Sequence, residues 1–350
     1  MFANFFKCAG FVCAFLFAGT ALAETEMTMQ SLYLPNQTQQ KEIVIPWAED
    51  IKAATKGEVV INVFPNRSIT KDTISAIKNG SLDIGGYTPS TFAKDNPYGT
   101  LLSLPGLLKN AKHGAAMSYA LYERVPEFKA EVDAIGVPLA MWSATHVAMT
   151  SVNDPIRTPD DVKGKKILTL SPAFSTIIKA WGGVPIVVSS SDVYMGLQRG
   201  MGDAILCALP AQAGMKTMEV TKYLTLIPAS LSSNIFTMNR DSWDELTDEQ
   251  KAYIASVSGR KLADRLANSL VADAEKVLQR FRDAGVQEVV LTPEELQKFV
   301  DLAKQTIDTD WAKIEIKGHD TKEVIDMYYK LAAEAGNPDD LKKMIIKEFG

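Results

Sequence analysis

The side chains in this sequence that could carry out catalysis are few, and they do not form a recognisable catalytic set. The histidines are His113, His146 and His319, and one cysteine, Cys207, follows residue 23. The sequence has no H-E-x-x-H, no G-x-S-x-G, no glycine-rich phosphate loop with lysine, and no cysteine or histidine pair at metal-binding spacing. A nucleophile pair of Cys207 and His146 lacks a third group to orient it. We therefore expect no catalytic residue, no metal and no cofactor, and a protein that is not an enzyme.

The first 23 residues have the layout of a secretory signal peptide. Lys7 precedes an apolar run over 8–18, and the small-residue sequence A-L-A follows at 21–23. The run is shorter than the roughly 20 apolar residues that cross a bilayer, although an uncleaved anchor is the alternative reading. We expect cleavage before Glu24 and a periplasmic mature chain that does not insert into the membrane.

Composition restricts the partners and the means of stabilisation. The formal net charge of −5 becomes −6 once Lys7 is removed, and the charges are dispersed. A mildly acidic chain of this kind argues against nucleic acid and anionic membrane surfaces as partners. With Cys207 as the single thiol after residue 23, the chain has no intramolecular disulfide and depends on its hydrophobic core. A length of 350 residues, 46% of them hydrophobic, suffices for two domains.

Strand and helix patterns alternate through two halves of similar size. In the first half, we expect extended or strand segments at 27–34, 59–64 and 82–85, with helices at 37–55 and 72–78. In the second half, we expect strands at 166–170, 186–188 and 204–206, with helices at 171–183 and 192–199 and a capped turn at 158–161. The repeated alternation predicts an α/β architecture.

The C-terminal third has a different pattern. Residues 248–284 contain no proline and one glycine, Gly259, and keep an apolar stripe at helical spacing. We expect one long helix, or two with a kink near Gly259, that packs across both halves. The irregular heptad argues against a coiled-coil dimer seam.

Several segments of the chain resemble one protein family, in the right order along the sequence. They are NGSLDIGGYTPSTF (79–92), SLPGLL (103–108), WSATHVAMTSVNDPI (142–156), TPDDVKGKKI (158–167), the helix ending in WGG (181–183), VPIVVSSSDVYMGLQRG (184–200), GDA (202–204) and MNRDSWDELTDEQKAYI (238–254). Together they resemble the solute-binding subunits of tripartite ATP-independent periplasmic (TRAP) transporters of the DctP type. The resemblance implies a two-lobed α/β receptor with a ligand cleft between its lobes, which closes over a small organic solute and delivers it to membrane permease subunits.

The resemblance also implies how the chain divides. The family's chain crosses between its lobes more than once. We therefore expect lobe one at 27–143 plus 235–273, and lobe two at 144–234 plus 274–350. Ligand contacts made by both lobes would shift an open ensemble towards the closed form.

Three family positions are altered here. The family usually has a carboxylate-binding arginine where this chain has Leu168, and a second arginine where it has Val147 or Ala148. The family's asparagine after the V-D-G-Q-E stretch is replaced by Cys207. A buried carboxylate without a charge partner is costly, so a simple arginine-bound carboxylate is disfavoured. An amino alcohol, a neutral polyol or a small aromatic compound fits better, with a carboxylate held by His146 or Lys166 as the alternative.

The positions that align with the family's ligand contacts are mostly hydroxylated or aromatic. They are Tyr33, Tyr87, Thr88, Ser90, Trp142, His146, Leu168, Thr169, Ser190, Cys207 and Asn234. Structural readings remain open for Trp142 and His146 as packing residues at the lobe junction, and for Cys207 as a small buried apolar group. Asp203 is the nearest acid for a cationic ligand, but its family counterpart is structural. A ligand sensor in place of a transport receptor is also compatible with the sequence.

Overall fold

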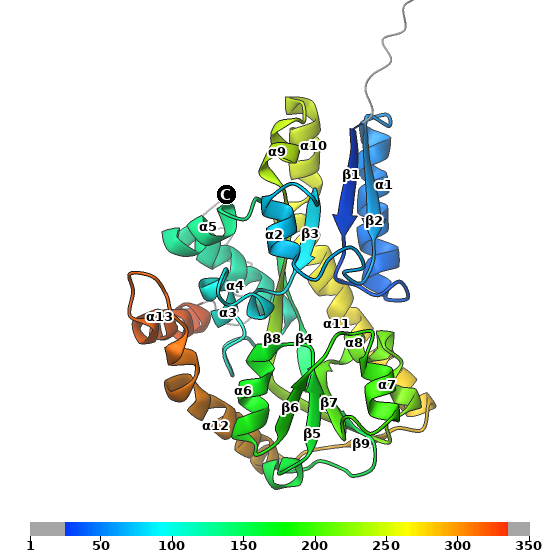
Figure 1. The fold of residues 1–350 in the computed structure, drawn as a ribbon, viewed down its shortest axis with the longest axis vertical. Coiled ribbons are helices and arrows are strands. Elements are labelled where there is room, and N and C mark those ends of the chain that lie inside the picture. The colour runs from blue at the N-terminus through cyan, green and yellow to red at the C-terminus, as the bar shows by residue number, and fades with distance from the viewer. Residues whose placement is uncertain (1–24, 335–350) are drawn as a thin grey trace, which may run out of the picture.

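A single mixed β-sheet runs through the whole protein, which is described here for residues 25–334 of a computed structural model (Figure 1). The predicted signal peptide, residues 1–23, and the end of the chain from residue 335 lie outside the described residues. The strands are β1 (Thr25–Gln30), β2 (Val59–Phe64), β3 (Ile84–Tyr87), β4 (Val137–Ser151), β5 (Lys166–Thr169), β6 (Val184–Val187), β7 (Ala204–Ala208), β8 (Tyr223–Met238) and β9 (Gln287–Val289). Their order within the described residues is β2-β1-β3-β8-β4-β7-β5-β6, and β9 pairs with β8.

Two long antiparallel strands, β4 and β8, join two lobes. At one end, β3 pairs antiparallel with β8, and β1 lies parallel to β2 and β3. At the other end, β7 pairs with β4, and β5 lies parallel to β6 and β7. In Figure 1, β1–β3 lie in the upper lobe and β5–β7 in the lower one, with β4 and β8 running between them. The α/β, two-lobed fold expected from the sequence is confirmed.

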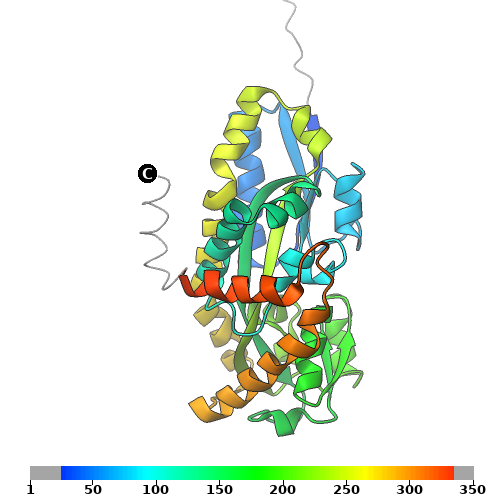
Figure 2. The ribbon, with the colours of Figure 1, turned by 90° about the vertical axis from the view of Figure 1, so that its left-hand side faces the viewer.

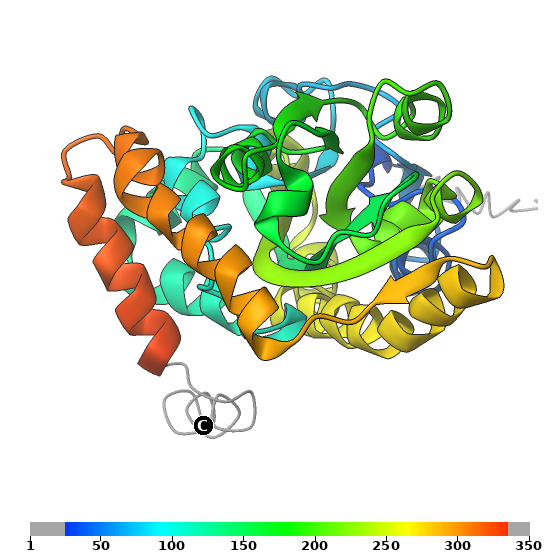
Figure 3. The same ribbon diagram turned by 90° about the horizontal axis from the view of Figure 1, so that it is seen from below.

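Helices cover both faces of this sheet. They are α1 (Ile45–Ala54), α2 (Thr73–Lys78), α3 (Pro97–Leu101), α4 (Ala111–Arg124), α5 (Pro126–Asp133), α6 (Pro172–Ala180), α7 (Val193–Gln198), α8 (Leu209–Gly214), α9 (Arg240–Asp244), α10 (Asp248–Val257), α11 (Gly259–Asp283), α12 (Pro293–Thr309) and α13 (Thr321–Glu334). Figure 3, a view from below, shows α11 in yellow and α12 in orange along one face of the central strands. Short turns also occur, among them η2 (Pro89–Thr91) after β3 and η3 (Pro159–Val162) before β5.

Local sequence signals account for most of these boundaries. The Asp72 carboxylate accepts a hydrogen bond from the backbone N–H of Ser75 and caps α2. Thr247 and Gln250 form a reciprocal capping box at the start of α10. The predicted long helix is divided into α10 and α11 at Gly259, whose φ of 59° lies in the left-handed region.

The helix predicted at 37–55 differs in its first part. The chain forms a π-helical turn, η1 (Gln40–Val44), before α1 begins at Ile45. Pro46 lies in the first turn of α1, directly after this π-helical turn, and has no backbone N–H to donate to the preceding turn. The long strands β4 and β8 were missed, because most of β4 is buried and its sequence lacks the polar alternation of a one-sided strand.

The helix α11 connects the cores of the two lobes. Its N-terminal half, with Leu262 and Leu266, packs in the lobe-one cluster around Trp47 and Trp142. Its C-terminal half contributes Phe281 to a second cluster that contains Leu224 of β8. The expectation that this helix packs across both halves is therefore met.

The end of the described chain returns to lobe one. Figure 2 shows α12 and α13, in orange and red, along one side of the molecule. Val324 and Tyr328 of α13 belong to the same apolar cluster as Phe128 of α5, and the Tyr328 hydroxyl donates to the carbonyl of Tyr98 at 2.8 Å. The predicted boundaries assign α13 to lobe two, but this packing fits a division that leaves α13 with lobe one.

Candidate ligand cleft

The loops at the ends of the parallel strands face one another across the two lobes. Ser90, in η2 after β3, has its Oγ 3.1 Å from Oγ of Ser171, which follows β5. Ser190, after β6, donates to Oδ1 of Asn66, after β2, at 2.8 Å. Ligands of open α/β sheets bind at such strand ends, so these contacts mark the region where a solute can touch both lobes.

A second pair of contacts joins the segment after β1 to α8. The side-chain amide of Asn36 donates to the carbonyl of Gly214 at 3.2 Å, and that of Gln37 donates to the carbonyl of Pro210 at 3.2 Å. Both donors come from the strand-end loop of lobe one, and both acceptors belong to the helix after β7. The described hydrogen bonds therefore join the strand-end loops of the two lobes at three places.

Tyr33 and Trp142 lie together beside this segment. Their ring centroids are 6.2 Å apart, and both side chains are buried. Burial raises the pKa of Tyr33 above its ordinary value, and the Trp142 indole offsets part of this effect. Neither the Tyr33 hydroxyl nor Nε1 of Trp142 has a partner with hydrogen-bond geometry among the described residues. Both residues belong to the buried cluster of lobe one that contains Trp47 and Phe236, and the indole N–H lies near enough to the Tyr33 hydroxyl to affect its pKa. Buried polar atoms without a geometric partner are places where a water molecule or a polar ligand atom can bind.

Two of the predicted residues in and after β3 and in β8, Thr88 and Asn234, contact each other, whereas the third, Tyr87, lies in the core. Oγ1 of Thr88 donates to Oδ1 of Asn234 at 2.8 Å, so these two predicted residues do lie together. Tyr87 instead points into the lobe-one core, with its ring edge-to-face against Phe92 at 6.3 Å. Burial raises the pKa of Tyr87, and its hydroxyl has no hydrogen-bond partner in the described part of the chain.

The predicted residues on β5 and β7 form an apolar wall in lobe two. Leu168 and Cys207 belong to one buried cluster, which also touches Leu34 of the segment after β1. Leu168 packs closely under Gly202, where an added Cβ would lie 2.5 Å from Cγ of Leu168. Thr169 is buried beside Ser171 and accepts a hydrogen bond from its backbone N–H at 3.4 Å. Leu168 therefore has a packing role of its own.

His146 and Asp203 are the two remaining residues that the sequence analysis named. His146 lies on β4 opposite Leu231 of β8, between two register irregularities, and its side chain is not among those described. The Asp203 carboxylate accepts a hydrogen bond from the backbone N–H of Lys166 at 2.7 Å, which agrees with the structural role implied by the family.

Sequence reasoning missed Arg67. This residue follows β2 in the loop that carries Asn66, and its Cζ lies 6.0 Å from the centroid of the Phe92 ring. The signal that could have found it is its position, because a cation in a strand-end loop of a parallel sheet is well placed to meet a ligand.

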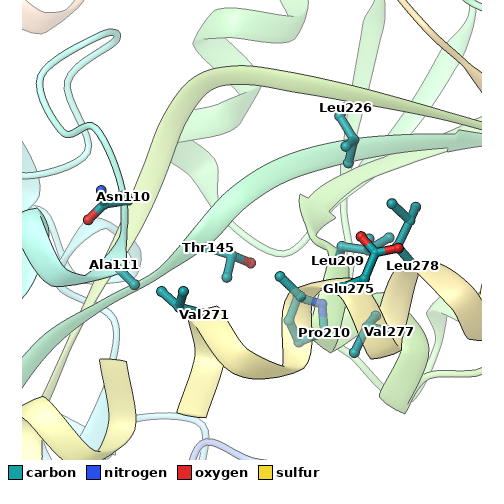
Figure 4. A pocket seen from close by; sticks show the side chains of 11 residues that line it. Asn110, Ala111, Thr145, Leu209, Pro210, Leu226, Val271, Glu275, Val277 and Leu278 are labelled. Atoms are coloured by element: carbon teal, nitrogen blue, oxygen red, sulfur yellow. The ribbon is translucent and has the colours of Figure 1, made fainter. Parts of the chain in front are cut away.

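A pocket of about 310 Å³ lies between α11 and the central strands (Figure 4). Its lining is mainly apolar and comprises Asn110, Ala111, Thr145, Leu209, Pro210, Leu226, Val271, Ala274, Glu275, Val277 and Leu278. None of the predicted contact residues lines it, although Thr145 precedes His146 and Leu209 follows Cys207 by two positions. The pocket is therefore separate from the predicted contact residues.

Among residues 25–334, no group of three or more acidic, histidine or cysteine side chains could hold a metal ion. No helix in the same range is long and apolar enough to span a bilayer.

Comparison with known proteins decides the family. The sequence model for the bacterial extracellular solute-binding proteins of family 7, DctP, matches residues 31–314. The chain belongs to this family. Its members are solute receptors of TRAP transporters and not enzymes, so the family resemblance seen in the sequence is confirmed.

Curated relatives agree with this assignment. The family 7 chain is 28% identical to the 2,3-diketo-L-gulonate-binding periplasmic protein YiaO of Escherichia coli K12, over 89% of this chain and 97% of the relative. It is 27% identical to the C4-dicarboxylate-binding periplasmic protein DctP of Rhodobacter capsulatus, over 79% of this chain and 83% of the relative.

Solved structures confirm the fold. A marine metagenome TRAP solute-binding protein specific for aromatic acids, in complex with 3-hydroxybenzoate, matches with a TM-score of 0.82 at 18% identity, covering 90% of this chain and all of the other. A TRAP solute-binding protein from Rhodoferax ferrireducens with benzoate matches with a TM-score of 0.80 at 16% identity, covering 89% and 98%.

Proposed function

We propose that this protein is the periplasmic receptor of a TRAP-type transporter, which closes over a small organic solute and presents the closed form to membrane permease subunits. The observation that carries the proposal is the set of hydrogen bonds between the strand-end loops of the two lobes, above all those of Ser90 with Ser171 and of Ser190 with Asn66. Contacts of this kind stabilise a closed form, and a ligand bound by both lobes shifts the population towards it.

Export is part of the proposal. The layout of residues 1–23 is typical of a secretory signal peptide, and the relatives YiaO and DctP are periplasmic. Mass spectrometry of the protein purified from the periplasm tests this directly. A mature N-terminus at Glu24 is expected, and a full-length chain retained in the membrane fraction contradicts it.

The chemistry of the cleft favours a small aromatic or hydroxylated solute. The Tyr33 hydroxyl and Nε1 of Trp142, which lack a partner with hydrogen-bond geometry within residues 25–334, suit an oxygen acceptor. The relatives support this range, since their ligands include 3-hydroxybenzoate, benzoate and 2,3-diketo-L-gulonate. An amino alcohol or a neutral polyol also suits a cleft in which Leu168 replaces the family's arginine, so the charge of the solute is a separate question.

A thermal-shift screen of the mature protein tests this function. The panel contains small aromatic acids, sugar acids, polyols and amino alcohols. A solute at 100 times its dissociation constant adds about 2.7 kcal/mol to the free energy of unfolding and raises the melting temperature accordingly. Small-angle scattering must then show compaction with that solute, and unchanged dimensions at saturation contradict closure.

The alternative role, a ligand sensor, predicts a different partner. A TRAP receptor in its closed form should bind a purified small-plus-large permease pair in detergent. A ligand-loaded protein that ignores the permease and binds a membrane sensor would support the alternative.

A further inference from the structure

Arg67 lies in a loop that is held tightly against the cleft. The backbone N–H of Arg67 donates to the carbonyl of Ser31 at 3.0 Å, and that of Asn66 donates to the carbonyl of Tyr33 at 2.9 Å. These bonds tie the loop after β2 to the segment after β1 that carries Tyr33. The Asn66 side chain meanwhile accepts the hydrogen bond from Ser190 of lobe two. Arg67 thus follows directly on a residue that joins the two lobes.

The backbone of this loop is unusual for its residues. Asn66 has φ 55° and Arg67 has φ 49°, so two consecutive non-glycine residues adopt the left-handed conformation. Asparagine tolerates this region, but a long side chain such as arginine adopts it at a cost. The surrounding hydrogen bonds hold the strained conformation and fix the direction in which the arginine leaves the backbone.

The guanidinium of Arg67 is partly buried and has no anionic partner. Within residues 25–334, Arg67 makes no ion pair and no side-chain hydrogen bond; its described contact is with the face of Phe92, 6.0 Å away. Burial lowers the pKa of the guanidinium, but arginine remains protonated at physiological pH. A partly buried cation without an anionic partner is costly to the protein, and it is stabilised by an anion that accepts two of its donors side by side.

We propose that Arg67 is the anion-binding residue of this cleft and that the solute is an organic carboxylate, held from lobe one. The inference rests on the proposed function and deepens it, because it assigns a charge to the solute. The family's usual arginine position is occupied by Leu168, which packs in the core of lobe two. Arg67 supplies the missing charge from lobe one, in the loop whose backbone is hydrogen-bonded to Ser31 and Tyr33. A cationic amino alcohol would be repelled there, so Arg67 reverses the ligand charge suggested by Leu168 alone.

Matched acids and amides test the proposal by titration calorimetry. The probes are benzoate, 3-hydroxybenzoate and succinate, each paired with its uncharged amide. The proteins are the wild type, Arg67→Gln, Arg67→Lys, and Arg240→Gln as a control, since Arg240 is an exposed arginine at the start of α9. At least one acid should bind the wild type roughly tenfold or more tightly than its amide.

The variants separate charge from geometry. Arg67→Gln should lose that preference and weaken binding of the acid by roughly tenfold or more, whereas Arg67→Lys should fall between the two because it keeps the charge without the bidentate geometry. Arg240→Gln should bind like the wild type. An Arg67→Gln protein that binds the acid as tightly as the wild type overturns the proposal, and so does a wild type that binds amides as tightly as acids. In both cases the receptor function stands.

The melting temperature of the ligand-free protein tests the role of Arg67 if no solute is found to bind. If neither acids nor amides nor any other solute binds the wild type, the proposed function fails, and the melting temperature of Arg67→Gln decides the role of the arginine. An unpaired cation kept for a ligand predicts an unchanged or raised melting temperature in the ligand-free protein. A lowered melting temperature, with Arg240→Gln unchanged, assigns Arg67 a structural role and overturns the inference.

Discussion

The hydroxyl oxygens of Ser90 and Ser171 lie 3.1 Å apart, although the two residues are separated by 81 positions and belong to opposite lobes. Ser90 is placed by the turn after β3 and Ser171 by the start of α6 after β5. The contact exists only when both strand-end loops meet. It therefore reports on closure and contributes little to the folding of either lobe.

Removing this contact should weaken solute binding without weakening either lobe. A hydrogen bond of this kind contributes about 1 kcal/mol net, so Ser171→Ala should raise the dissociation constant of the solute roughly fivefold. Calorimetry measures the affinity, and thermal unfolding of the ligand-free protein should be nearly unchanged. Ser256→Ala, on exposed α10, is the control. If Ser171→Ala lowers the free energy of unfolding of the ligand-free protein by as much as it weakens the free energy of binding, Ser171 serves folding instead.

Restoring the family's arginine at position 168 should damage the protein. Leu168 is fully buried among Val193, Leu197 and Ile205, and it fills the space under Gly202. Leu168→Arg places an unpaired charge there and should lower the free energy of unfolding by roughly 3–5 kcal/mol. Denaturant unfolding measures the loss. Leu168→Met, which conserves volume, should cost less than about 1.5 kcal/mol. A stable arginine variant with a new carboxylate preference would mean that the position faces the cleft after all.

Glu131 should make stability fall as pH rises towards neutrality. Burial raises the pKa of this carboxyl to about 7, although its oxygens accept hydrogen bonds from the backbone N–H groups of Tyr98 and Gly99. A carboxyl whose pKa is higher in the folded than in the unfolded state favours folding while it is protonated. That contribution is fully present below the unfolded pKa and is lost as pH rises through about 7.

Thermal unfolding between pH 4 and pH 8 checks this sign. The wild type should lose roughly 1–3 kcal/mol across the interval relative to Glu131→Gln, which has no titrating group at this position. Glu49→Gln, at an exposed position on α1, should follow the wild type. Parallel curves for the wild type and Glu131→Gln would contradict the assignment.

Cys207 should be unreactive in the folded protein. The thiol is buried, and burial raises its pKa above the ordinary value, so little thiolate forms at pH 8. A chromogenic disulfide reagent should label no thiol in the native mature protein and one in guanidinium chloride. Rapid native labelling that a bound solute suppresses would instead place Cys207 on an accessible surface of the cleft.

Local sequence signals determined the boundaries of several helices and strands, and the order of family segments determined the family and its fold. Capping residues such as Asp72 and Thr247 set helix starts, and Gly259 set the break between α10 and α11, because each acts on backbone groups within a few positions. The same short-range patterns predicted β2 with its exact bounds and α6 to within three residues at its end. The family, and with it the two-lobed fold, followed from many such segments occurring in one order.

Tertiary structure alone decided which polar groups lack partners and which residues meet across the lobes. The contacts of Ser90 with Ser171 and of Ser190 with Asn66 join positions 81 and 124 apart, and no local pattern encodes such a distance. The sequence predicted that Tyr33 and Tyr87 are both ligand contacts, yet the structure buries each in a core cluster, Tyr33 beside Trp142 and Tyr87 beside Phe92. Arg67 looks like any other loop arginine in the sequence. Its importance depends on burial and on the absence of an acid near it within residues 25–334, and these properties arise only when distant segments pack together.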